Sequence, residues 1–138
     1  MNYGRVILGG LLAGLILNIG EFLFNGVIMA SAMKEWAVAH NFPPEPTPTF
    51  FVAATVLTFL LGIVLVWLYA LIRPRSGPGP KTAIIAAIIM WFGICLYCTI
   101  IYGLLLQQPV NMLGIGIVWC LGEYVIAAIA GAWLYKEV

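Results

Sequence analysis

The sequence predicts an all-α integral membrane protein, a four-helix bundle made of two transmembrane hairpins in one domain of 138 residues. One observation is composition: the chain is 64% hydrophobic and only 8% charged, whereas soluble domains are about half apolar and a quarter charged. The other is length, because four apolar runs each reach the ~20 residues that a helix needs to cross a bilayer. A chain this short cannot hide so much apolar surface from water, so much of it is expected to face lipid.

The four predicted spans cover residues 6–33, 50–72, 82–106 and 112–135. Each run is too long and too continuously apolar for a barrel strand, and four strands could not close a barrel, so we expect helices. The N-terminus has some features of a signal peptide. Its apolar run is longer than a usual signal core and carries Asn18 and Glu21, which favours a retained first helix.

The three connections between these spans differ in composition. The first, residues 34–49, contains four prolines in 43–48 and is expected to be extended. The second, residues 73–81, is short, basic and rich in turn-forming residues. The third, residues 107–111, is short and uncharged.

Basic residues predict the orientation. Lys34 stands alone at one end of the predicted spans, while the opposite end carries Arg5, Arg73, Arg75, Lys81 and Lys136. By the positive-inside rule both termini and the second connection lie in the cytoplasm, an N-in/C-in topology in the inner (plasma) membrane. In the second connection we expect lipid headgroup contacts worth ~1 kcal/mol each from Arg73, Arg75 and Lys81, or a role in topology alone.

Glu21 interrupts the first apolar run at bilayer depth. An ionisable side chain there costs at least ~2.5 kcal/mol, so it is expected to face the bundle interior. Steps of four, three and four residues place on one helical stripe Gly14, Asn18, Glu21 and Asn25. We expect the amides of Asn18 and Asn25 to hydrogen bond to the carboxyl group and to support an ion- or ligand-binding site.

Glu123 interrupts the fourth run in the same way. Its stripe also carries small residues that allow a neighbouring helix to approach, namely Gly116, Cys120, Ala127 and Ala130. Counted from the predicted outer ends of their helices, Glu21 and Glu123 both lie roughly 17 Å deep, near the middle of the bilayer. The sequence therefore predicts two neighbouring carboxyls that share a proton or a cation; the competing interpretation is a protonated pair that only joins two helices by hydrogen bonds.

Other motifs give weaker indications. Cys95 and Cys98 form a CxxC pattern that a redox enzyme could use, but it lies mid-membrane with no second pair in an outward loop, so apolar packing is the better interpretation. His40 is the only histidine, and no spacing of histidines and cysteines indicates a metal site or a cofactor. A net charge of +1 gives no basic field to attract nucleic acid.

Two resemblances follow from these features. The chain resembles small multidrug-resistance transporters in outline, with four helices and a membrane glutamate in the first, but it departs from them in its second glutamate, long proline-rich loop and clear charge bias. The exit Ile72-Arg73-Pro74-Arg75 and the closing segment 129–133 are similar to a group of uncharacterised small four-helix bacterial inner-membrane proteins. That resemblance implies the fold and no known activity.

Three classes of function remain open from the sequence. The first is ion- or proton-coupled transport or small-ligand binding at the mid-membrane carboxylates, by a homo-oligomer, since one small bundle encloses little. The second is a non-catalytic accessory or assembly subunit of a larger membrane complex. The third, an enzyme acting on lipid or quinone, has least support, because no nucleophile with a base and no metal cluster is recognisable and no catalytic residue is assigned.

Overall fold

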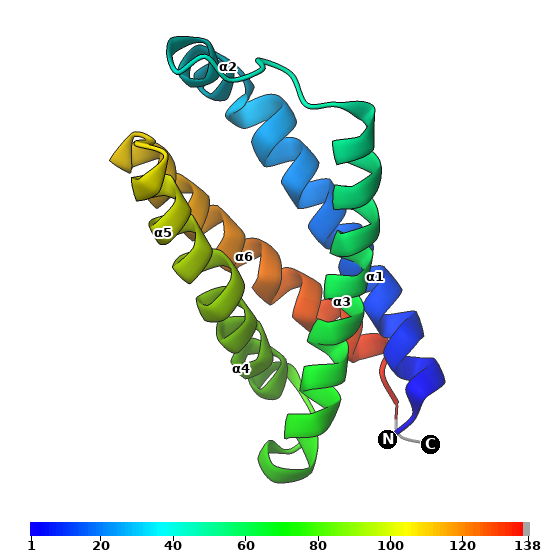
Figure 1. Ribbon diagram of the computed structural model, residues 1–138. Helices are drawn as coiled ribbons and strands as arrows, with labels where there is room; N and C mark the ends of the chain where they lie inside the picture. Colours follow the sequence, from blue (N-terminus) through cyan, green and yellow to red (C-terminus); the bar gives the residue numbers. More distant parts are fainter. Residues whose placement is uncertain (137–138) are drawn as a thin grey trace.

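The computed structural model describes residues 1–136, and all regular structure within them is helical (Figure 1). The α-helices and two π-helical turns (η) follow one another as α1 (Tyr3–Leu23), η1 (Phe24–Ile28), α2 (Ala30–Ala39), α3 (Pro48–Ser76), α4 (Pro80–Met90), η2 (Trp91–Leu96), α5 (Tyr97–Leu105) and α6 (Val110–Leu134). Four continuous stretches are long and apolar enough to cross a membrane: residues 3–28, 48–76, 80–105 and 110–134. These correspond to the four predicted spans.

Capping residues define where two of the long helices begin. The Asn2 side chain accepts a hydrogen bond from the backbone N–H of Arg5 at 3.1 Å, and Thr47 does the same for Phe50 at 3.3 Å. Pro48 occupies the first turn of α3, where its missing N–H would have no helical partner. These polar side chains satisfy donors that the first turn leaves open, so the sequence itself sets the helix starts.

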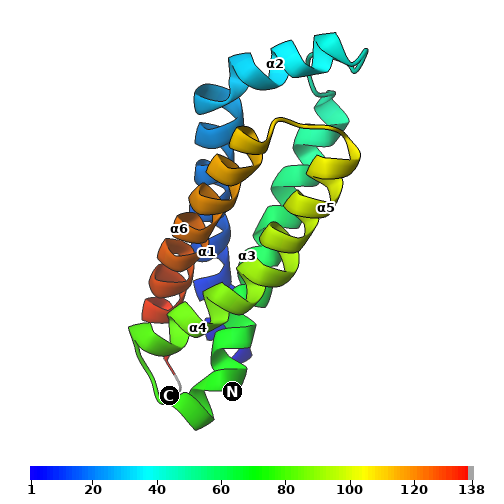
Figure 2. The same cartoon turned by 90° about the vertical axis from the view of Figure 1, so that its left-hand side faces the viewer.

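The first helix differs from its predicted extent, because the chain does not continue straight to Met33. In η1 the backbone N–H of Met29 bonds to the carbonyl of Phe24 at 2.8 Å, so the ladder shifts by one residue. Met29 itself (φ −104°, ψ 6°) leaves the helical conformation. Beyond it α2 turns across the end of the bundle (Figure 2). The mainly apolar composition from Phe22 to Met33 gives no sign of this change of direction.

The bundle is packed tightly at the end that holds both termini and opens toward α2 and α5 (Figure 1). There α1 packs against α3 and α6, and α4 packs against α6, whereas α5 meets α6 only sparsely. Small residues permit the close approach: a Cβ on Gly62 of α3 would lie 2.5 Å from the carbonyl oxygen of Gly10 in α1. The core at this end is rich in alanine, with Ala13, Ala83, Ala86, Ala87 and Ala127 fully buried.

Candidate functional site

Glu123 is buried between α6 and α1, with its side chain lying directly on the backbone of Gly20. A Cβ added to Gly20 would lie 2.6 Å from Cδ and 2.8 Å from Oε2 of Glu123. Real side chains do not tolerate such distances, so the glycine creates the space that the carboxyl group occupies. Only 7% of Glu123 is exposed.

The Glu123 carboxyl group has no hydrogen-bond partner among the described residues for either oxygen. Burying a polar group without a partner costs several kcal/mol, and burying an unpaired charge costs more. This carboxyl therefore needs a partner that a bare polypeptide does not supply: a proton, a water molecule or a cation. Both of its oxygens are among the buried side-chain polar atoms that lack a hydrogen-bond partner in the described residues.

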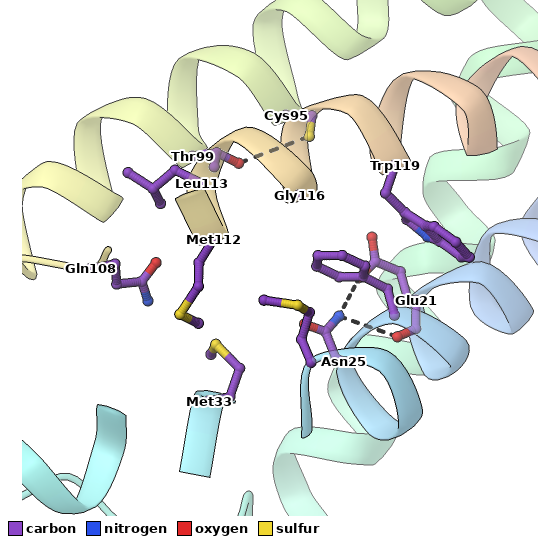
Figure 3. A pocket seen from close by; sticks show the side chains of 12 residues that line it. Glu21, Asn25, Met33, Cys95, Thr99, Gln108, Met112, Leu113, Gly116 and Trp119 are labelled. Atoms are coloured by element: carbon purple, nitrogen blue, oxygen red, sulfur yellow. Dashed lines mark hydrogen bonds between the residues drawn. The ribbon is translucent and has the colours of Figure 1, made fainter. Parts of the chain in front are cut away.

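Glu21 lies on the other side of Gly20 and lines a cavity of about 210 Å³. The side-chain amide of Asn25 donates a 2.7 Å hydrogen bond to Glu21 Oε2 and a 3.2 Å bond to the Glu21 backbone carbonyl. Figure 3 shows this pair beside Trp119 at the inner end of the cavity. The cavity has room for several water molecules beside the Glu21 carboxyl group.

The cavity lies between two walls that diverge toward α2. One wall comes from α1, η1 and the start of α2; the other comes from η2, α5 and α6. Both π-helical turns contribute to it, through Asn25 in η1 and Cys95 in η2. Single π-helical turns are frequent at functional sites, because they re-aim side chains that a regular helix would point elsewhere.

The two glutamates are neighbours but do not pair as the sequence suggests. Glu21 bonds to Asn25, and the Glu123 oxygens bond to no described residue, so the two carboxyl groups are not joined by a hydrogen bond. The first helix also breaks at Met29 and does not run on to Met33, the residue from which the position of Glu21 was counted. The carboxyl group of Glu21 therefore lines the cavity, and that of Glu123 is buried against Gly20.

Trp119 is a site residue that the sequence analysis missed. Its indole N–H donates to the Gly20 carbonyl at 3.3 Å, and its ring stacks on Phe24 with centroids 5.7 Å apart. It therefore holds α6 against α1 at the boundary between the cavity and Glu123. The signal was present, since residue 119 precedes Glu123 by four and shares its helical face.

Asn18 does not line the cavity. Its amide donates to the Gly14 carbonyl at 2.9 Å and to the Thr55 carbonyl of α3 at 3.4 Å, so it joins α1 to α3. The residues that the sequence predicts to form one polar face therefore lie in two different environments. Asn25 supports Glu21, while Asn18 faces α3, the other helix of its own hairpin.

The cysteines and the basic residues are placed in different environments. Cys95, Cys98 and Cys120 are all free thiols; of these Cys95 lines the cavity, 3.9 Å from the hydroxyl of Thr99. Arg73 lies over the Tyr135 ring, 5.5 Å from its centroid. Arg75 and Lys81 are exposed, and their contact with lipid headgroups stays a prediction.

No family model, curated protein or solved structure matches this chain. The site itself offers a cavity-lining carboxyl with an amide donor, a dry carboxyl without a partner, and a thiol. Among the described residues no three His, Cys, Asp or Glu side chains gather as a metal-binding group. This arrangement suits the reversible binding of a proton or a single small cation.

Proposed function

We propose that this protein spans the inner membrane and carries out ion- or proton-coupled transport, with Glu21 and Glu123 as its ion-binding groups. One observation carries the proposal: a buried carboxyl without a hydrogen-bond partner lies against Gly20, the residue next to Glu21, whose carboxyl faces a cavity. Ionisable groups at such depth are expensive, and in membrane proteins they commonly mark ion and proton pathways.

Insertion in a bilayer is supported by the helices and their surface. Four stretches have the length and hydropathy of membrane spans, and large apolar side chains such as Val118, Trp133 and Leu105 are 71–74% exposed. In water such a surface would be a severe liability, while in lipid it is ordinary. The bias of lysine and arginine supports N-in/C-in orientation, which would place α2 and the cavity entrance outside.

The proposed path has two parts, one through the cavity and one through the packed core. A proton or cation enters through the cavity, meets Glu21 with its Asn25 partner, and passes beside Gly20 to Glu123. Beyond Glu123 the core is tightly packed, so passage to the cytoplasm requires the α1–α3 hairpin to shift against α4–α6. A homo-oligomer would complete the walls that a single small bundle leaves open.

A second candidate is a non-catalytic accessory or assembly subunit of a larger membrane complex. The favouring observation is that α5 meets α6 only sparsely and leaves Tyr97 and Tyr102 each 60% exposed. A partner subunit could cover this face. Co-purification of stoichiometric unrelated subunits after gentle solubilisation would support it, whereas recovery of this chain alone would count against it.

Proton flux into proteoliposomes tests the transport proposal. Vesicles with an enclosed pH dye are driven by a potassium diffusion potential set with valinomycin, and internal acidification is followed. We expect Glu21→Gln and Glu123→Gln each to abolish the protein-dependent signal, while Glu35→Gln, exposed on α2 outside the cavity, leaves it unchanged. Undiminished flux in both the Glu21→Gln and Glu123→Gln variants would overturn the proposal.

A further inference from the structure

Three of the five methionines of the chain line this one cavity: Met29, Met33 and Met112. Figure 3 shows the thioethers of Met33 from α2 and Met112 from the first turn of α6 pointing toward one another. The two residues are far apart in sequence and come from the two opposite walls of the cavity. Thioether sulfur is thus concentrated at the α2 end of the cavity.

Met29 and Met33 reach this position from the same side. The backbone N–H of Met33 donates to the carbonyl of Met29 at 2.9 Å, which makes one regular helical turn between them. Residues four apart on such a turn project from the same face. The break at Met29 that turns α2 across the bundle end therefore also presents both thioethers to α6.

Thioethers select a particular kind of ion. They are soft, uncharged ligands that suit Cu(I) and its redox-stable analogue Ag(I), whereas Mg²⁺ and Ca²⁺ prefer oxygen and Zn²⁺ takes thiolate, imidazole or carboxylate. No cluster of three His, Cys, Asp or Glu is found among the described residues to serve those other ions. We propose that Met29, Met33 and Met112 form a binding site for a soft monovalent metal ion, Cu(I) or Ag(I).

Core packing explains the position of these three methionines less well than metal binding does. Methionine often fills irregular gaps in cores, and Met90 does so here, since it belongs to the packed core cluster and is absent from the cavity wall, whereas Met29, which is equally buried, lines the cavity. The three cavity methionines instead border empty space.

Silver binding by the purified protein in detergent tests the site. Ag(I) is titrated by calorimetry into wild type and into Met29→Leu, Met33→Leu and Met112→Leu, which conserve side-chain volume. We expect one bound ion in wild type, affinity lowered by about tenfold or more in each single variant, and no binding in the triple variant. Met90→Leu is the matched control and should bind as wild type does.

Two further measurements distinguish the methionine site from a thiol site and from the proposed transport function. Binding that survives in the triple variant but is lost in Cys95→Ser would overturn the methionine site in favour of a thiol. The methionine site and the proposed transport function share the cavity, but the methionine site does not use the carboxyl groups. Glu21→Gln should therefore abolish proton flux and leave Ag(I) binding intact. Absence of Ag(I) binding together with normal proton flux would refute the metal site alone.

Discussion

Glu123 of α6 occupies the space that a side chain on Gly20 of α1 would fill, with its Cδ only 2.6 Å from where a Cβ would stand. This contact places a buried carboxyl beside the residue that precedes Glu21. It divides the site into a cavity-lining carboxyl with an amide donor and a dry carboxyl without a partner. The two carboxyl groups differ in this way because residue 20 is a glycine and has no Cβ.

Replacement of Gly20 by alanine should therefore displace Glu123. Forcing a methyl group into a filled space costs about 1–3 kcal/mol, and we expect lower thermal stability in detergent together with loss of proton flux. Gly122 is the matched control, because it lies in α6 next to Glu123 with nothing within 4 Å of its added Cβ. There alanine should raise stability by up to about 1 kcal/mol through helix propensity; equal effects at the two positions would contradict the contact.

Replacement of Glu123 by methionine should separate stability from function. Because the carboxyl has no described hydrogen-bond partner, exchanging it for an apolar side chain of similar size should be neutral or stabilising, by up to about 4 kcal/mol. Proton flux should be lost. Thermal unfolding of the variant in detergent checks this, and a marked fall in stability would favour the purely structural role of an interhelical hydrogen bond.

Asn25 and Asn18 should behave differently although they share one predicted stripe. Asn25→Leu removes the 2.7 Å hydrogen bond to Glu21, and a bond to a charged group is worth about 1.5–3 kcal/mol, so we expect proton uptake to be roughly ten- to hundredfold slower. Asn18→Leu removes only contacts to the Gly14 and Thr55 carbonyls and should lower stability without slowing uptake. Equal flux in the two variants would argue against a special role for Asn25.

Reporter fusions should establish the proposed orientation. Green fluorescent protein fused after residue 138 should fluoresce, and alkaline phosphatase inserted in the connection 41–47 should be active, because the positive-inside rule places these points on opposite sides. Alkaline phosphatase inserted at residues 77–79 should be inactive. Reversed activities at the two insertion points would place the cavity entrance in the cytoplasm.

The sequence predicts the helical fold and the four apolar stretches because hydropathy averaged over twenty residues is insensitive to local detail. It also finds Glu21, Asn25 and Glu123, since polar residues in apolar runs are conspicuous. It does not predict η1, η2 or the break at Met29, where the hydrogen-bond ladder shifts without any change in composition.

The arrangement of the two carboxyls is also beyond the sequence. Counting residues from Met33 to place Glu21 assumes that the first helix is straight. Treating Asn18 and Asn25 as one polar stripe assumes that a single helix packs against it, whereas α3 and α6 contact different faces of α1. That Gly20 and not Gly122 provides the space for a carboxyl depends on the crossing of α1 and α6. Such a crossing is a property of the whole bundle.

Infrared difference spectroscopy tests most directly whether the buried carboxyl exchanges its proton. Purified protein in lipid is stepped between acidic and alkaline buffer, and the C=O stretching band of protonated carboxylic acid is recorded in wild type and in Glu123→Gln. We predict a reversible, deuterium-sensitive band in wild type, part of which disappears in the variant. A spectrum in which Glu123 contributes no pH-dependent band would contradict an ion-binding role and leave this glutamate a structural residue.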